Sequence, residues 1–388
     1  MLINELPDDC LLTIFDCIQD LTDLVNCFKV CEKWRNLVVV RTKKVKYFTG
    51  RPNNSPDSVG HQSDEPFDVT FFSKWFPNLR QIVDFCTCKG ISIDVADKII
   101  RDSKSLKGII ADKCSFWVCL DDLPRILMNA NLEMLFTDYK FVATSVINEN
   151  MKQLCLSTYS GYLPMEVAHT FPNLERLNIT FCLAVRAGHY AYGPVMANLK
   201  IVELLVFSYR LYDWEEFRDS LAVMDLCPAL QSAHINYLSA HAGINFNDSV
   251  KNANLQDLVI QFGQPIEWDD LRRLMSKYPN LKHLALRGTF LKDDHIKQLI
   301  LLLPKLTLLD IRESPGVTQD AANFVQDYCK RYGRSIKFYF KKDDKQIEID
   351  YPQSLNRPEQ ICRGFDFMEH CFFKSFNDLP HFLDPIDD

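Results

Sequence analysis

Cysteine and histidine are the side chains in this sequence whose types could support metal or nucleophilic chemistry. The chain has 388 residues, with 14 cysteines and 9 histidines. A structural zinc site needs closely spaced pairs of such ligands. The nearest approach is Cys86-Thr87-Cys88, which has no second pair and no His-x₃-His phrase to complete a tetrahedron. The spacing therefore predicts no metal site and no bound cofactor.

The phrases typical of catalysis are also missing. Neither G-x-x-x-x-G-K-[ST] nor G-x-G-x-x-G occurs in the sequence. His189, His234 and His283 have no visible partners for a catalytic triad, so we interpret them as surface or satisfied histidines. We expect the protein not to be an enzyme and to act by binding other proteins.

Charge and hydropathy exclude further classes of partner. The net charge is −7, from 44 Lys and Arg against 51 Asp and Glu, so no overall basic character favours nucleic acid or an anionic membrane. No window approaches the roughly 18 apolar residues of a membrane span. Glu5, Asp8 and Asp9 occupy the place of the basic region of a signal peptide. We expect free thiols in the cytoplasm or nucleus.

One phrase recurs along the chain. "FPNLERLNI" (171–179), "YPNLKHLAL" (278–286) and "LPKLTLLDI" (303–311) share the frame L-x-x-L-x-L. The alternation in its second half predicts a short strand with one buried face. The first residues of ten such frames, about 25 positions apart, are 79, 106, 132, 151, 174, 199, 230, 255, 281 and 306. A last strand is expected at "SIKFYF" (335–340).

Amphipathic helices are expected between the frames, at 267–278, 293–303 and 318–333. One strand and one helix cannot bury their own apolar faces, whereas stacked copies can. The sequence in this respect resembles the leucine-rich-repeat family. The resemblance implies an α/β fold in which a curved solenoid carries parallel strands on its concave side and helices outside.

The first helices carry a second pattern. Leu11, Ile14, Phe15 and Ile18 form an apolar stripe, and two further short helices are expected at 21–30 and 30–38. Such a unit is too small to be stable alone, so part of its apolar surface is expected to bind a partner. The order of Leu6-Pro7, the stripe, Leu21, Leu24 and the closing V-C-x-x-W of Val30 to Trp34 resembles the F-box motif.

The resemblance implies a docking function. F-box proteins bind the Skp-type adaptor of a cullin–RING ubiquitin ligase, the SCF complex, and present a protein substrate for ubiquitin transfer. The chain has no RING-type series of cysteines and histidines of its own. The implied adaptor-binding residues are Leu6, Pro7, Leu11, Ile14, Phe15, Leu21, Leu24, Val30 and Trp34. Some of these side chains could instead pack the three helices together.

The x positions of each frame are expected on the concave face, where a substrate would bind. Aromatic residues also gather at the strand exits, and aromatics are enriched at protein interfaces. They could equally fill the rim between repeats. The predicted substrate-binding residues are Tyr139, Tyr159, Asn178, Thr180, Phe181, His234, Asn236, Tyr237, Gln261, Phe262, Arg287, Asp310 and Arg312. The substrate itself is unknown.

Composition sets the expected domain boundaries. The F-box occupies 1–40, a linker follows at 41–70 with a flexible loop at 51–66, and the repeats fill 71–340. The segment 341–388 carries 11 Asp and Glu against six Lys and Arg, with six phenylalanines that should pack somewhere. It could cap the open end of the solenoid or fold back across the concave face. We favour the cap, because repeat arrays need a polar end.

Two functions fit these patterns. One is a substrate receptor of a ubiquitin ligase. The other is a leucine-rich scaffold whose F-box-like helices only cap the array. They differ in whether the apolar stripe at 6–34 is open to a partner, and the intact motif favours the receptor.

Overall fold

The structure is a computed structural model that describes residues 3–49, 55–61, 72–82, 93–110, 131–137, 147–157, 163–183, 195–207, 220–238, 246–312, 314–342, 345–355 and 359–386. The fold is mixed α/β, with helices at the N-terminus followed by parallel strands. The chain divides into two compact units, Met1–Val146 and Ile147–Asp388. Each unit is described by itself.

The ten predicted frames each precede a strand, and the first residue of every frame is buried. The strand begins two residues after that residue, as at Leu174 and β7 (Arg176–Leu183) or Leu281 and β11 (His283–Arg287). All pairings between described neighbouring strands are parallel. The frame therefore predicts the strands correctly, because its leucines alternate with the period of a half-buried strand.

The first unit begins with helices and continues into a sheet. Its elements are η1 (Ile3–Glu5), α1 (Asp8–Asp16), α2 (Leu21–Val30), α3 (Glu32–Thr42), β1 (Tyr47–Thr49), β2 (Ser58–Gly60), α4 (Phe72–Trp75), β3 (Gln81–Ile82), α5 (Ile93–Asp102), β4 (Gly108–Ile110) and β5 (Met134–Thr137). The strand order is β5-β4-β3-β1-β2. β2 is thus the last strand on its side, next to the strand that follows α3.

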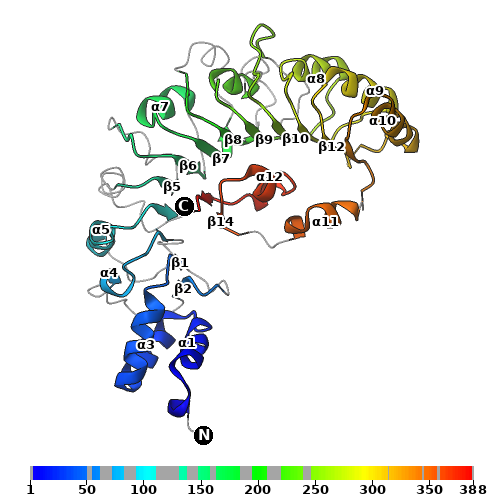
Figure 1. The fold of residues 1–388 in the computed structure, drawn as a ribbon. Helices are drawn as coiled ribbons and strands as arrows, with labels where there is room; N and C mark the ends of the chain where they lie inside the picture. The colour runs from blue at the N-terminus through cyan, green and yellow to red at the C-terminus, as the bar shows by residue number, and fades with distance from the viewer. Residues whose placement is uncertain are drawn as a thin grey trace. The chain divides into compact units, whose positions relative to one another are not determined.

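The second unit stacks its strands in chain order, from β6 to β13. They are β6 (Gln153–Leu156), β7, β8 (Ile201–Phe207), β9 (Ser232–Tyr237), β10 (Asp257–Phe262), β11, β12 (Leu308–Asp310) and β13 (Lys337–Tyr339). Helical segments between them are α7 (Leu163–Thr170), η5 (Ser220–Leu226), α8 (Trp268–Met275), α9 (Asp293–Leu302) and α10 (Gln319–Tyr332). In Figure 1 these strands line the inner side of an arc, with α7 to α10 on its outer side.

The three helices expected at 267–278, 293–303 and 318–333 are confirmed as α8, α9 and α10. α10 ends at Gly333, whose φ of 63° places it in the left-handed region that glycine tolerates best. Gly288 is held more tightly: its φ is 67°, and a Cβ there would lie 2.1 Å from the carbonyl oxygen of Phe262. Consecutive turns therefore stack too closely for a side chain at this position.

An asparagine ahead of several frames joins one repeat to the one before it. Asn173, Asn198, Asn254 and Asn280 each donate a side-chain hydrogen bond to a backbone carbonyl about 25 residues earlier. The bonds are 2.8 to 3.1 Å long. They satisfy carbonyl groups at the entrance of the strands and fix the spacing between repeats.

Two expectations about the segments outside the repeats are wrong. The loop predicted at 51–66 contains β2, which pairs with β1 and buries Ser58 and Val59. Hydrogen bonds to the helices order residues 55–61, the part of this segment that the structure describes. The other correction concerns the C-terminal segment, which we expected to cap the end of the solenoid.

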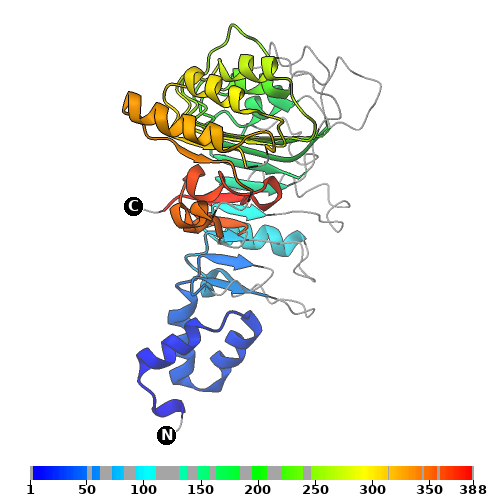
Figure 2. The same ribbon diagram turned by 90° about the vertical axis from the view of Figure 1, so that its right-hand side faces the viewer.

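The C-terminal segment instead lies on the inner face of the second unit's sheet. It forms α11 (Gln346–Asp350), η6 (Pro352–Leu355), β14 (Ile361–Arg363), α12 (Phe367–His370), η7 (Phe376–Asp378) and β15 (Phe382–Asp384). Figure 2 shows it on the face opposite α8 to α10. Its phenylalanines pack against strand residues such as Val259, Ala285 and Leu308, because these side chains leave an apolar surface on that face.

Candidate protein-binding surfaces

The N-terminal helices pack around a small apolar core. Leu11 and Phe15 of α1, Leu21 and Leu24 of α2, and Leu37 of α3 are buried. Phe15 meets Trp34 edge to face, with 5.1 Å between the ring centroids. Asp20 caps α2 by accepting hydrogen bonds from the backbone N–H groups of Thr22 and Asp23. The helices thus hold each other by their largest side chains.

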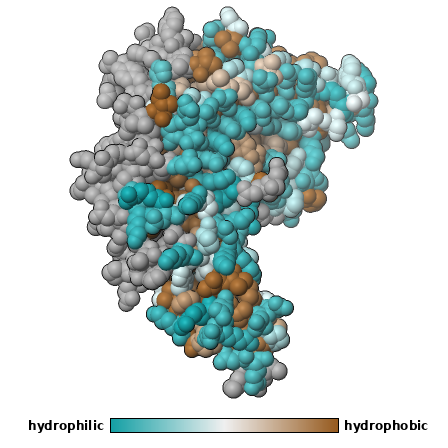
Figure 3. All heavy atoms as spheres, turned by 60° about the vertical axis from the view of Figure 1, so that its left-hand side comes forward, coloured by the Kyte–Doolittle hydropathy of each residue, from teal (hydrophilic) through white to brown (hydrophobic). Residues whose placement is uncertain are grey.

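Other apolar side chains of the same helices face solvent. Ile14 of α1 is 41% exposed, Val30 at the end of α2 is 57% exposed, and Ile3 of η1 is 50% exposed. Pro7 is also exposed, and Figure 3 shows hydrophobic residues at the surface of these helices. Side chains of this size seldom stay exposed together in a monomer, and they favour a partner surface.

The nine predicted adaptor-binding residues differ in how far they are exposed to solvent. Pro7, Ile14 and Val30 are exposed, and Leu6 and Trp34 are half-buried. The other four follow the alternative that some of these side chains pack the helices together, because the core of the helices takes them up. The four buried residues are Leu11, Phe15, Leu21 and Leu24. A single stripe of apolar residues serves both the core and the surface, and its spacing does not separate them.

Sequence reasoning missed three exposed apolar residues of this region. Ile3 precedes the Leu6-Pro7 dipeptide, and Val39 and Val40 lie on the last helix. The Val38-Val39-Val40 run was a usable signal, because three adjacent positions of a helix cannot all face one core. Val38 is the buried member.

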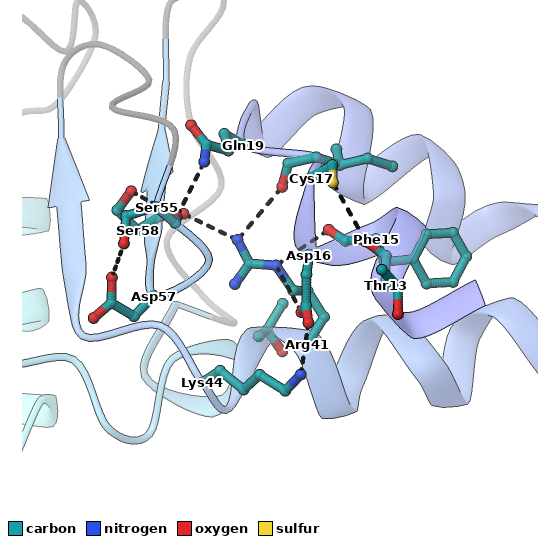
Figure 4. Close-up of polar contacts among 12 residues, drawn as sticks. Thr13, Phe15, Asp16, Cys17, Gln19, Arg41, Lys44, Ser55, Asp57 and Ser58 are labelled. Carbon is teal, nitrogen blue, oxygen red and sulfur yellow. Dashed lines mark hydrogen bonds and ion pairs between the residues drawn. The ribbon is translucent and has the colours of Figure 1, made fainter. Parts of the chain in front are cut away.

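A buried arginine joins the helices to the sheet of the first unit. Arg41 of α3 is fully buried, and its Nε donates to the carbonyl oxygen of Phe15 at 3.2 Å. One Nη donates to the carbonyl oxygen of Ser58 in β2 at 3.0 Å (Figure 4). Asp16 supplies a carboxylate 3.7 Å from Nε. Burial is the main influence on the pKa of Arg41 and lowers it, and the nearby Asp16 opposes that shift.

Backbone and amide bonds complete this junction. The backbone N–H of Gly60 donates to the carbonyl oxygen of Gln19 at 2.7 Å, and the Gln19 amide donates to the carbonyl oxygen of Ser55 at 3.1 Å. Figure 4 shows the side chains of Gln19 and Arg41 both reaching the segment that contains Ser55 and Ser58. The helices are thus fixed to β2 at several points, and a partner bound to them would be held at a defined place on this unit.

The inner face of the second unit carries polar strand residues as predicted, but the C-terminal segment covers them. Asn178 donates to Glu203 at 2.7 Å, which confirms that neighbouring x positions share a face. The predicted substrate-binding residues that are buried in the structure are Asn178, His234, Asn236, Tyr237, Phe262, Arg287 and Asp310. The prediction that they form an open surface is wrong in this structure.

The remaining predicted substrate residues are placed as follows. Gln261 and Arg312 are half-buried, and the Arg312 guanidinium pairs with Asp310 at 2.9 Å. Tyr139 and Tyr159 lie outside the described residues. Thr180 and Phe181 belong to β7, but their side chains are not described.

A buried ion pair lies at the centre of the covered face. Arg176 and Glu203 meet at 2.7 Å, and both side chains are almost fully inaccessible. Burial opposes the charge on Arg176, but the Glu203 carboxylate overcomes it and raises the pKa of the guanidinium. Arg176 also donates to the carbonyl oxygens of Pro380 at 2.6 Å and His381 at 3.0 Å. The pair therefore holds the C-terminal segment by its main chain.

Two further strand residues hold that segment in the same way. Gln153 donates to the carbonyl oxygen of Leu383 at 2.6 Å and accepts from its N–H at 3.0 Å. Arg287 donates to the carbonyl oxygens of Lys374 at 2.8 Å and Phe372 at 3.2 Å. Gln153 and Arg176 occupy the same position of their frames, so the sequence places them on this face, yet nothing local indicates their partners.

Histidines and cysteines of this face are in environments that suppress their reactivity. Burial, with the charge of Arg176, lowers the pKa of His381 to about 4, and burial lowers the pKa of His234 as well. Burial raises the pKa of the Cys371 thiol, and the Glu203 carboxylate adds to that shift. A thiol in this state is a poor nucleophile at neutral pH.

The described part of the chain offers neither a metal site nor a membrane span. No group of three His, Cys, Asp or Glu side chains there could hold a metal ion. No described helix is both long enough and apolar enough to cross a bilayer.

Comparison with known proteins identifies the helical part. The F-box-like family model matches residues 3–41, which covers η1, α1, α2 and nearly all of α3. No curated protein matches the chain. The resemblance of the first helices to an F-box is thus confirmed, and F-box domains generally bind Skp-type adaptors.

Proposed function

We propose that this protein is a substrate-recognition subunit of an SCF-type ubiquitin ligase. The F-box-like helices would dock on a Skp-type adaptor and, through it, on a cullin–RING ligase. The stacked strands and helices, which we interpret as a leucine-rich-repeat solenoid, would hold a protein for ubiquitination and degradation. The chain itself would be non-catalytic and would act in the cytoplasm or nucleus.

One observation carries this proposal. Helices matched by the F-box-like model bury one set of apolar residues and leave Ile14, Val30 and Pro7 in solvent. A protein interface of standard size buries about 1,600 Å² and depends on a few large side chains at its centre. The exposed set supplies such side chains, and the buried set keeps the helices folded without the partner.

The junction at Arg41 supports the same function. A substrate receptor must hold its substrate at a defined distance from the ligase, and a flexible linker after the F-box would lose that definition. Arg41, Gln19 and Gly60 connect the helices to β2 by hydrogen bonds. The segment expected to be a flexible linker is in this part a structural joint.

A scaffold without ligase function is the alternative. It would use the same helices only to cover the start of the array, and their exposed apolar residues would then have no partner. The two proposals differ in a single measurable property, which is adaptor binding through the exposed residues.

The test is a binding titration of the purified full chain with a Skp-type adaptor. We expect Ile14→Asp to weaken binding at least about tenfold while leaving thermal unfolding unchanged, because Ile14 faces solvent. Ile349→Asp is the matched control, since Ile349 of α11 is 71% exposed and lies far along the chain from the F-box. A folded wild-type chain that does not bind the adaptor would favour the scaffold.

Phe15 is unsuitable for this purpose. Its ring is buried against Trp34, so Phe15→Ala would open a cavity and cost about 3–5 kcal/mol of stability. Weakened binding by that variant would report unfolding of the helices and not the loss of a contact.

A further inference from the structure

The C-terminal segment covers the face on which we expected a substrate to bind. It seats six large apolar side chains in buried positions, and a ligand that displaced them would expose their surface to water. These residues are Phe367, Phe372, Phe376, Leu379, Phe382 and Leu383. A ligand for the inner face would have to replace these contacts and the main-chain bonds of Arg176 and Arg287. A surface that the C-terminal segment does not cover is therefore a more accessible place for a substrate.

β13 is the open edge of the second unit's sheet. It is the terminal strand of the order and pairs only with β12. Lys337 donates its N–H to the carbonyl oxygen of Thr307 at 2.8 Å, and the carbonyl oxygen of Tyr339 accepts from the N–H of Ile311 at 2.8 Å. The backbone groups of the residue between them, Phe338, point the other way. Within the described ranges no backbone bond to Phe338 from that side is present.

The edge is held rigidly in place. Gly333 ends α10, and Arg334 then donates to the carbonyl oxygens of Ile300, Leu303 and Leu306 at 2.9 to 3.2 Å. These bonds tie the start of the last strand to the end of α9. An edge that is already ordered loses little entropy when a further strand adds to it.

The side chains around this edge are basic and aromatic. Residues 328–342 contain six Lys and Arg and no Asp or Glu, although Asp327 precedes them and Asp343 and Asp344 follow. Phe338 and Phe340 are half-buried and stack with their centroids 5.4 Å apart. The Lys341 ammonium lies 5.5 Å from the centre of the Phe340 ring.

The basic residues in and directly after β13 differ in whether a described acidic residue pairs with them. Lys337 is neutralised by Asp350 at 3.0 Å. Lys341 and Lys342 are exposed, and neither has an ion pair with any described residue. The stretch 328–342 is therefore net positive, in a chain whose net charge is −7. A negatively charged partner would be attracted to this place in particular.

We infer that the open edge of β13 is a docking strand for an extended, acidic segment of a protein substrate. The substrate segment would add to the sheet by pairing with the outward backbone groups of Phe338. The carboxylates of the segment would then lie near Lys341 and Lys342. Edge lysines also repel unwanted strands. Lys341 and Lys342 would disfavour neutral and basic strands and attract acidic ones. The same two residues would thus make the edge selective for acidic segments.

Nucleic acid is the less favoured occupant. Its binding is carried by many phosphate contacts, and Lys337, the basic residue within the strand, is already paired with Asp350. The unpaired N–H and C=O groups of an edge match a peptide backbone, which supplies both an acceptor and a donor at each residue.

The test is a fluorescence anisotropy titration of the full chain with a labelled peptide of about ten residues that alternates Glu and Val. Binding is expected, with Lys341→Glu/Lys342→Glu weakening it about tenfold. The matched control is Lys282→Glu/Lys305→Glu, which reverses two exposed lysines away from the edge and is expected to change affinity less than about twofold. The same peptide N-methylated at alternate residues should bind about tenfold more weakly, because it lacks donors for the edge.

Three results would overturn the inference: no binding of the peptide by the wild-type chain, equal binding of the N-methylated peptide, or tighter binding of a single-stranded oligonucleotide of equal charge. The inference rests on the proposed function for the partner's role as a substrate. The two fail separately, because the peptide titration contains no adaptor. Adaptor binding without peptide binding overturns the docking strand alone, and the reverse outcome overturns only the ligase function.

Discussion

The terminal strands β2 and β13 present opposite solutions to an exposed sheet edge. At β2 the chain closes the edge itself: Arg41 donates to the carbonyl oxygen of Ser58, and Gly60 donates its N–H to Gln19. At β13 no described residue bonds to the outward backbone of Phe338, and Lys341 and Lys342 stand beside it. One edge is used to hold the F-box-like helices, and the outward backbone of the other has no hydrogen bond from the described residues.

The two edges show how closed and open surfaces of this chain differ in their polar contacts. Where two parts of the chain must keep a fixed geometry, buried arginines of one part donate to backbone carbonyl groups of the other, as at Arg41 in the first unit and Arg176 in the second. Where a surface is free, it is marked by unpaired charge or exposed apolar side chains. A buried charged group is costly to leave without its partner, so closed surfaces should be sensitive to substitution and open ones tolerant.

The largest effect is expected at the closed inner face of the second unit. Arg176→Met should lower the free energy of unfolding by about 3–5 kcal/mol, because it leaves Glu203 buried without its counter-charge. Urea denaturation measures the loss, and hydrogen exchange should show it first at 371–386. Arg273→Met, which removes an exposed pair with Asp248, should cost less than about 1 kcal/mol. Equal losses in the two variants would contradict the closed-surface interpretation.

The closed edge at β2 should respond next. Arg41→Met is expected to cost about 2–3 kcal/mol, because the carbonyl oxygens of Phe15 and Ser58 lose a charged donor in a buried place. Lys44→Met is the control at the same junction, since Lys44 is exposed and pairs with Asp16 at the surface. Thermal unfolding of the full chain checks both. A tolerated Arg41→Met would show that the edge is not closed by this residue.

A smaller effect is expected from acid. His381 has a folded-state pKa of about 4 against about 6.5 when unfolded. Above pH 6.5 both states are neutral. Between 6.5 and 4 the unfolded state binds the extra proton, so stability falls as pH falls, by up to about 1.4 kcal/mol per unit.

The histidine contribution can be isolated by difference. Wild type should lose about 1–2 kcal/mol relative to His381→Gln between pH 6.5 and 5, measured by urea denaturation at each pH. Staying above pH 5 keeps most carboxylates out of the titration. Parallel pH profiles of the two proteins would show that His381 is accessible to protons in the folded chain.

The smallest effect on stability is expected at the open edge. Lys341→Val/Lys342→Val should change the unfolding free energy by less than about 0.5 kcal/mol, because both side chains are exposed and form no ion pair with a described residue. The same variant should self-associate with rising concentration, since an apolar edge pairs with other edges. Sedimentation velocity at several concentrations tests this, and a strictly monomeric variant would mean that the edge is already blocked.

Sequence patterns predicted the repeated elements well. The first residues of the ten frames, nine leucines and Met151, all precede strands and are all buried, because hydrophobic alternation acts over a few residues and does not depend on the rest of the chain. The F-box-like helices were equally predictable from the Leu6-Pro7 and Val30 to Trp34 phrases. The division between core and surface within them was not, because Leu11 and Ile14 lie on one apolar stripe and differ only in what packs above them.

By itself, the sequence determined the local structures: strands, helices, their order and the shared face of Arg176, Asn178 and Glu203. Only the tertiary structure decided what covers that face. The contacts of Gln153 with Leu383 and of Arg176 with Pro380 join positions more than 200 residues apart. Such contacts leave no periodic signal, because they depend on the curvature of the whole unit and on where the chain turns back after β13. The phenylalanines of the C-terminal segment predicted that it would pack against the rest of the chain. The apolar strand residues of the sheet determined where it packs.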